Sequence, residues 1–372
     1  MVTVSVTRCD SYDIQMVRRA LLEALAPLGG VERFVRPGMK VLLKPNQLSA
    51  AAPEQAVATH PTVIQAVAEL VQQAGGAVSI GDSPAGPVEI AHQVWARTGM
   101  AEAAARVGAP LVLFKEAEWK RLNGCDYFIA KPLYEADLVI NLPKIKTHGL
   151  TLYTGAVKNL FGAIPGTRKR ELHLRAVGMP EFSHVLADVL ELVRTDLTII
   201  DGVVGLEGEG PGTRGTPHAY HCLAASPDPL ALDTVITRAM GYRPGEVLHL
   251  AEAGARGLGV ANPEAIEIVG DRQALSFGPL HLPTSKWFLR VPPWMSAPIY
   301  RATRRRPQVL PALCIGCGRC AQVCPADVIT AGKPPAFALE RCIGCLCCAE
   351  ICPQAAITVH RNVLSRLLGV GR

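Results

Sequence analysis

The chain has 372 residues, of which 49% are hydrophobic and 19% are charged. This balance excludes a disordered chain and indicates a globular protein with a large core, and the length favours at least two domains. The net charge of +6 is mild and comes partly from three consecutive arginines at 304–306, so we expect no nucleic-acid partner. We expect a cytoplasmic protein, because we find neither an apolar signal-peptide segment nor an apolar run long enough to span a membrane.

Residues 1–285 alternate between two kinds of apolar pattern. Short stretches rich in β-branched residues predict strands at 2–6, 40–43, 77–80, 111–114, 138–141, 197–200 and 265–269. Apolar residues at helical spacing predict helices at 14–28, 63–73, 88–98, 182–194, 230–240 and 246–252. Strands that alternate with amphipathic helices predict an α/β domain whose mostly parallel sheet is covered by helices on both faces.

Polar side chains follow several of these strands, and ligands of such folds bind beyond the carboxyl ends of strands. The residues in question are Lys44, Asn46, Asp82, Lys144, Lys146, His148 and Asp201. Further basic and amide groups lie in 144–173, among them Lys158, Asn159, Arg168, Lys169, Arg170 and His173. One interpretation is a solvated basic face. The other is a site for a small anionic ligand such as a carboxylate or phosphate, because a lysine directly after a buried strand is costly without a partner.

Residues 210–215 match G-x-G-x-x-G, the glycine pattern of dinucleotide-binding loops. That pattern must open a helix, whereas residues 216–220 predict a turn and a strand, so we expect a flexible loop near a site rather than NAD binding. Neither a phosphate loop, nor an H-E-x-x-H motif, nor the C-x3-C-x2-C run of S-adenosylmethionine radical enzymes occurs in the sequence.

Two cysteine runs near the end of the chain both spell C-x2-C-x2-C-x3-C-P, and the second repeats the first 28 residues later. This spacing is typical of two-cluster bacterial ferredoxins, in which the fourth cysteine of each run ligates the other cluster. It predicts two [4Fe–4S] clusters, one held by Cys314, Cys317, Cys320 and Cys352, the other by Cys342, Cys345, Cys348 and Cys324. The additional Cys347 is expected to be a packed thiol beside a cluster.

The remaining segments surround this ferredoxin domain, which we place at residues 311–360. Residues 286–310 are rich in aromatic, proline and arginine residues, which suits a linker packed between the domains. The alternative for 286–306 is contact with a membrane surface, with aromatics on one side and arginines on the other. Residues 361–372 form a short basic amphipathic tail.

Four stretches of the large domain resemble the DUF362 family. They are Lys44-Pro-Asn46, Gly81-Asp-Ser-Pro84, the segment 141–148 and the segment 155–162. The resemblance spans roughly residues 1–270 and implies an iron–sulfur protein, and its fold is expected to be distantly similar to the N-terminal domain of lactate-racemase-like proteins. The positions it marks are Lys44, Asn46, Asp82, Lys144, Lys146, His148, Lys158 and Asn159. Asp201 rests on the strand-end argument alone.

Two functions remain open from the sequence. In the first, the protein is a ferredoxin-linked oxidoreductase with Lys144, Lys146, His148 and Asp82 as catalytic residues. Its ligand would then be bound by Lys44, Asn46, Lys158, Asn159 and Asp201. In the second, it is an electron carrier or adaptor without chemistry of its own, and the large domain docks to a redox partner protein or a ferredoxin-linked enzyme.

Overall fold

The computed structural model describes residues 1–176, 178–283 and 306–360. The predicted tail 361–372 and residues 286–305 of the predicted linker lie outside the described residues. Among the described residues, no helix is long and apolar enough to cross a membrane.

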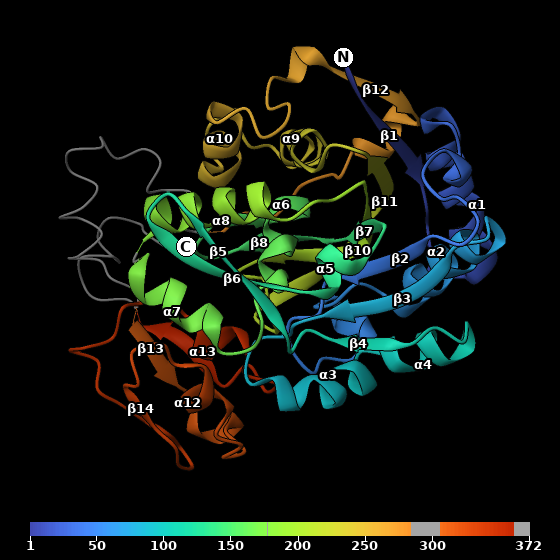
Figure 1. The fold of residues 1–372 in the computed structure, drawn as a ribbon. Coiled ribbons are helices and arrows are strands. Elements are labelled where there is room, and N and C mark those ends of the chain that lie inside the picture. Colours follow the sequence, from blue (N-terminus) through green and yellow to red (C-terminus); the bar gives the residue numbers. More distant parts are fainter. Residues whose placement is uncertain (177, 284–305, 361–372) are drawn as a thin grey trace.

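The described part of the large domain is built on a ten-stranded sheet (Figure 1). Its main path runs through β12 (Ile266–Gly270), β1 (Val2–Arg8), β11 (Gly215–Ser226), β10 (Leu197–Gly208), β7 (Leu138–Leu142), β2 (Lys40–Pro45), β3 (Ala77–Asp82) and β4 (Leu111–Leu113). Two further strands lie off this path: β8 (Lys144–His148) pairs with β10, and β9 (Leu152–Thr154) pairs with β8. The strands from β10 through β4 are parallel, as is β1 with β12, whereas β11 is antiparallel to both of its neighbours. The predicted mostly parallel sheet is therefore confirmed.

Helices cover both faces of this sheet, as the alternating pattern predicts. One face carries α1 (Ile14–Leu25), α2 (Pro61–Gln73), α3 (Ala91–Arg97) and α4 (Met100–Arg106). The other carries α6 (Ala156–Asn159), α8 (Met179–Leu192), α9 (Pro229–Ala239) and α10 (Leu248–Ala255). Successive strand side chains point to opposite faces, so Val41 and Leu43 pack with the first group while Leu42 packs with the second.

Several elements differ from the predictions for identifiable reasons. The helix predicted at 14–28 ends at Leu25 and tightens into a 3-10 turn, where Pro27 lacks an N–H for the helical ladder. Strand β10 continues to Gly208 through Asp201, a polar residue that the sequence places at a strand end. The hairpin of β5 (Ala117–Leu122) and β6 (Cys125–Ala130), the short α5 (Pro132–Glu135) and α7 (Arg168–Arg175) lack a clear apolar period and were not predicted.

The cysteine-rich domain comprises residues 306–360. It contains β13 (Arg306–Val309) paired with β16 (Ile357–His360), β14 (Ile329–Thr330) paired with β15 (Ala336–Phe337), and the short helices α12 (Arg319–Val323) and α13 (Cys347–Glu350). The sequence places residues 306–309 in the linker, but their pairing with β16 makes them part of this domain. In Figure 1 the domain, drawn in orange to red, lies beside α7 of the large domain.

Candidate functional site

A buried ion pair joins the carboxyl ends of β2 and β3. Lys44 Nζ lies 2.7 Å from Asp82 Oδ1 and donates to the backbone oxygen of Asn159 at 2.7 Å. Both side chains are almost inaccessible, and burial lowers the pKa of Lys44 although Asp82 opposes that shift. A Cβ on Gly162 would lie 2.3 Å from Asp82 Oδ1, so only glycine leaves room for the pair. Lys44 therefore neutralises Asp82.

Lys146 and Asn159 are connected through Asn46 beside this pair. Asn46 accepts a hydrogen bond from Lys146 Nζ at 2.6 Å and donates to Asn159 Oδ1 at 3.0 Å. Burial, together with the charges of Lys158 and Lys144, lowers the pKa of Lys146 to about 7. The predicted residues Lys44, Asn46, Asp82, Lys146 and Asn159 are thus brought together by the fold.

Lys144 and Asp201 form a second buried pair, which is closed on all sides. Lys144 Nζ lies 2.7 Å from Asp201 Oδ2 and 2.8 Å from the hydroxyl of Tyr12, which itself donates to Asp201 Oδ1 at 2.9 Å. The backbone N–H of His60 donates to the same carboxylate, and the His60 ring stacks on Tyr12 at 3.5 Å. The sequence assigns catalysis to Lys144 and ligand binding to Asp201; this pair lines none of the described cavities and is excluded from the candidate site.

His148 contacts the amine of Lys158. Its Nδ1 accepts the backbone N–H groups of Leu150 and Thr151 at 2.9 and 3.3 Å, so the ring proton of neutral His148 lies on Nε2. Nε2 faces Lys158 Nζ at 2.8 Å, and burial lowers the pKa of both groups. An N–H donor at this distance favours the neutral amine of Lys158. His148, predicted to be catalytic, does not line the cleft itself; its Nε2 lies beside two residues that do, Lys158 and, at 3.6 Å, Glu350.

Helix α7 contributes further basic side chains to the same site as Lys146 and Lys158. Lys169 Nζ donates to the backbone oxygen and hydroxyl of Ser83 at 2.8 and 2.9 Å, and burial lowers its pKa to about 7. His173 stacks on Phe182 at 4.4 Å, and burial lowers its pKa to about 3. The basic stretch that includes α7 is therefore partly buried rather than a solvated face.

These groups surround an interdomain cleft of about 820 Å³, a volume that includes space open to solvent. From the large domain it is lined by Asn46, Gln47, Asp82, Lys146, Thr154, Lys158, Asn159, Phe161, Lys169, Arg170 and His173, among others. The cysteine-rich domain closes it with Val323, Cys347 and Glu350. Two buried polar atoms of the lining residues, Gln47 Nε2 and Thr154 Oγ1, have no hydrogen-bond partner among the described residues. Buried polar atoms normally have partners, so these two suit a polar ligand.

The eight predicted cluster ligands separate into two cavities. One is lined by Cys314, Cys317, Cys320 and Cys352, and the other by Cys324, Cys342, Cys345 and Cys348. In the part of the chain that the structure describes, no three Cys, His, Asp or Glu side chains converge on a single metal ion. Four thiols around a cavity suit a cubane cluster, and the two sets are those of the predicted crossed assignment. The ligation itself stays a prediction.

Side chains of the large domain donate hydrogen bonds to the backbone of Cys324 and Cys352, the last cysteines of the two runs. Arg170 donates to the backbone oxygen of Cys324, to that of Gln322 at 3.2 Å, and to Asp327. Thr213 Oγ1 donates to the backbone oxygen of Cys352 at 2.8 Å. Arg170 also lines the interdomain cleft, so this residue borders the cleft and contacts a predicted ligand loop.

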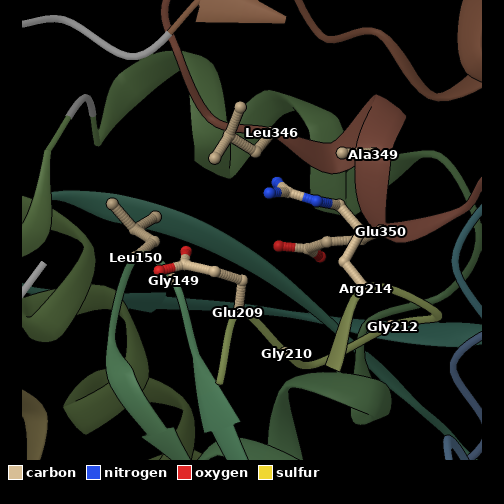
Figure 2. A pocket seen from close by; sticks show the side chains of 9 residues that line it. All are labelled: Gly149, Leu150, Glu209, Gly210, Gly212, Arg214, Leu346, Ala349 and Glu350. Atoms are coloured by element: carbon tan, nitrogen blue, oxygen red, sulfur yellow. The ribbon is translucent and has the colours of Figure 1, made fainter. Parts of the chain in front are cut away.

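The glycine-rich loop at 210–215 packs against α13. Figure 2 shows a small cavity between this loop and α13, into which Arg214 and Glu350 project. A Cβ on Gly212 would lie 2.5 Å from the backbone oxygen of Glu350. The loop leads into β11 and opens no helix, in agreement with the rejection of a dinucleotide motif. Its glycines allow close contact between the domains.

We expect Gly212→Val to separate the domains, because the obstructing atoms belong to the backbone of α13 and cannot rotate away. Overpacking of this kind costs about 1–3 kcal/mol. Hydrogen exchange should show faster exchange of the α13 amides in Gly212→Val than in wild type. Thr216→Val, which places the same side chain at an exposed position of the same hairpin, is the control. Unchanged α13 exchange in Gly212→Val would contradict this contact.

The sequence did not identify three site residues that are far along the chain from the groups they contact: Asp233, Cys347 and Glu350. Asp233 accepts hydrogen bonds from the Tyr153 hydroxyl at 2.9 Å and from the backbone N–H groups of Ala156 and Val157 at 2.7 and 2.8 Å. It thereby fixes the start of α6, which carries Lys158 and Asn159. Glu350 and Cys347 were missed as cleft residues because their contact with the large domain has no local sequence signal, although the extra cysteine beside the ligands marks the place.

Comparison with known proteins agrees with this two-part architecture. The family model described as "Domain of unknown function (DUF362)" matches residues 41–238, and the "4Fe-4S dicluster domain" model matches residues 306–353. The thylakoid-associated protein sll1697 of Synechocystis sp. is 38% identical over 271 residues, which are 72% of this chain and 82% of that protein.

One solved structure shows a weaker likeness. The lactate racemase apoprotein from Thermoanaerobacterium thermosaccharolyticum aligns with a TM-score of 0.35 and 16% identity over 56% of this chain. The chain spans about half of that protein's length, 51%. This likeness is too weak to transfer the racemase's chemistry. The DUF362 model alone covers more than half of the 372 residues, so the chain is an iron–sulfur protein that belongs to the DUF362 family.

Proposed function

We propose that the protein is a ferredoxin-linked oxidoreductase that binds a small anion in the interdomain cleft and reduces it there. The observation that supports this most is the composition of the cleft wall. Three lysines of the DUF362 domain, Lys146, Lys158 and Lys169, share the cleft with Cys347, which lies between two predicted cluster ligands.

The charges of the cleft favour an anion. Of the two carboxylates in the lining, Asp82 is already neutralised by Lys44, which leaves Glu350 alone to balance Lys146, Lys158 and Lys169 when these amines are protonated. Burial lowers the pKa of Lys146 and of Lys169 to about 7, so protonation of these amines costs little when a negative charge enters. Gln47 and Thr154 offer further hydrogen-bonding atoms to the same ligand.

The residues that would hold clusters are the two cysteine sets described above. Bound [4Fe–4S] clusters would supply electrons one at a time. The requirement for free thiolates is consistent with a reducing compartment and supports the cytoplasmic location that we propose. The name of the Synechocystis relative associates that protein, and not this one, with thylakoids.

Lys158 is the residue that we assign to proton transfer. Its Nζ lies 2.8 Å from His148 Nε2, and its side chain lines the cleft, whereas His148 does not. An anion in the cleft would stabilise the protonated amine of Lys158. Transfer of that proton from Lys158 to the reduced ligand would restore the neutral amine, which accepts the Nε2–H of His148.

The alternative is an electron carrier or adaptor that docks to a redox partner. Contacts from Arg170 and Thr213 to backbone oxygens of the cysteine-rich domain favour a fixed arrangement over a mobile carrier. A fixed domain that closes a basic cleft suits the oxidoreductase better.

A single-turnover experiment tests this function. The protein is purified anaerobically and photoreduced, and its reoxidation is followed by visible absorption after addition of 2-oxo carboxylates, unsaturated carboxylates, sulfite or nitrite. We expect one class to accelerate reoxidation at least about tenfold in wild type but not in Lys158→Met, because the positive charge and the proton are lost. Lys131→Met removes an exposed lysine outside the cleft and is the matched control.

The outcomes separate the two functions. If no anion accelerates reoxidation, while wild type and Lys158→Met pass electrons equally fast to a protein acceptor, the carrier function replaces the oxidoreductase.

A further inference from the structure

The two cysteine sets differ in their surroundings. In the set of Cys324, Cys342, Cys345 and Cys348, three cysteines are buried, and Cys347 beside them forms part of the cleft wall. In the set of Cys314, Cys317, Cys320 and Cys352, Cys317 is exposed and Cys314 is half-buried. One set therefore lies next to a residue of the cleft wall, and the other reaches the outer surface of the domain.

An apolar patch borders the outer set. Leu310, Leu313 and Ile315 are 38%, 48% and 55% exposed. Eight large hydrophobic side chains are exposed in the described part of the chain, and these three fall within six residues. Ile315 also lines the cavity of the outer set. Single exposed apolar residues are normal on a surface, but a group beside a redox site indicates contact with another molecule.

The charges around this patch have one sign. Arg319 lines the cavity of the outer set, and Lys333 lies between Gly332 and Pro335, which line it too. The side chain of Lys333 packs over Gly316, where a Cβ added to the glycine would lie 3.1 Å from Lys333 Cβ. Residues 306–326 contain no aspartate or glutamate, and the next acidic residue, Asp327, pairs with Arg170 of the large domain. The surface around the outer set is therefore apolar and basic.

We propose that the surface formed by Leu310, Leu313, Ile315, Arg319 and Lys333 is the docking site for a small acidic electron-carrier protein. In each encounter, one electron leaves the reduced carrier and one is gained by the group that Cys314, Cys317, Cys320 and Cys352 hold. Complementary charge steers such transient encounters, and a small apolar centre suffices for them. This inference rests on the proposed ligation of the outer set but not on the reduction of an anion in the cleft.

The test measures only electron transfer from the carrier into the protein. Oxidised protein is mixed with reduced acidic flavodoxin, and the rate of its reduction is followed by stopped-flow absorption at low and high salt. We expect the double variant Arg319→Glu, Lys333→Glu to be reduced about tenfold more slowly at low salt and to lose most of the salt dependence. Ile315→Ser should slow reduction at both salt concentrations.

Three controls make the result specific. Reduction by dithionite, which needs no docking surface, should be the same in all variants, and visible absorption should show that the iron–sulfur content is retained. Lys131→Glu reverses a charge on the large domain and should react with flavodoxin like wild type.

The inference is overturned if flavodoxin reduces the double variant as fast as wild type, or if dithionite is slowed equally. It is also overturned if size-exclusion chromatography shows a wild-type dimer that Ile315→Ser converts to a monomer, because a second copy would then cover the patch. A further contrary result is faster reduction after deletion of 286–305, which would mean that this segment covers the patch. The anion-driven reoxidation described above is measured separately, so either proposal can fail alone.

Discussion

Replacement of Cys352 by alanine is expected to remove the cluster held by Cys314, Cys317 and Cys320, although Cys352 lies in the other cysteine run. The reason is that Cys352 lines one cavity with those three cysteines. Electron paramagnetic resonance of the reduced protein should show loss of the interaction between two clusters and the signal of one remaining cluster. Iron analysis should show about half of the wild-type content.

The neighbouring thiol supplies the control. Cys347→Ala should retain both clusters, because Cys347 lines the interdomain cleft and neither of the two cysteine cavities. To identify which cluster is lost, Cys348→Ala should remove the other one and leave a spectrum distinct from that of Cys352→Ala. Identical spectra for Cys352→Ala and Cys348→Ala would contradict the crossed assignment.

Sulfate should bind in the cleft much more tightly at pH 6 than at pH 9. The pKa values of Lys146 and Lys169 are about 7, so both amines are charged below that pH and lose their charge above it. If bound sulfate requires both charges, each lysine weakens binding about tenfold per pH unit above its pKa. Sulfate keeps its own charge across this range. Isothermal titration calorimetry in several buffers would measure both the affinity and the protons taken up.

Single substitutions measure the separate contributions of Lys146 and Lys169 to sulfate binding. Lys146→Met should weaken sulfate binding at pH 6 and reduce the pH dependence to that of one group. Lys169→Met should do the same, whereas Lys131→Met should match wild type because Lys131 is outside the cleft. A sulfate affinity that does not change with pH would refute the role of these amines.

The strand-end rule identified three cleft residues, Asn46, Asp82 and Lys146, but did not distinguish a lysine of the cleft from an enclosed one. Lys144 and Lys146 are two residues apart on β8, so local pattern treats them alike. Only the long-range contacts with Tyr12 and Asp201 show that Lys144 is enclosed, while Lys146 lines the cleft. Such contacts connect residues far apart in the sequence and leave no periodic signal.

In the cysteine-rich domain too, features set by neighbouring residues were predictable, whereas contacts with the large domain were not. Ligand spacing is local, so the grouping of the cysteines was predictable from the two runs. The place where this domain docks was not, because it depends on close approach of Gly212 to the backbone of α13 and on the contacts of Arg170. Helix α7, which carries Arg170, was itself unpredicted because its sequence is almost entirely polar.

Arg170 lies between the interdomain cleft and the backbone of Cys324, a predicted cluster ligand. Its guanidinium contacts the backbone of Cys324, and the residue also lines the cleft, so an anion bound beside Arg170 would attract the charge that holds the cysteine loop. If anion binding alters the contact between Arg170 and Cys324, thermodynamic reciprocity requires that a change in this contact alters anion affinity by the same factor. We therefore expect anion binding in the cleft to change the absorption spectrum of a cluster held by Cys324, and this change would be measurable without any turnover.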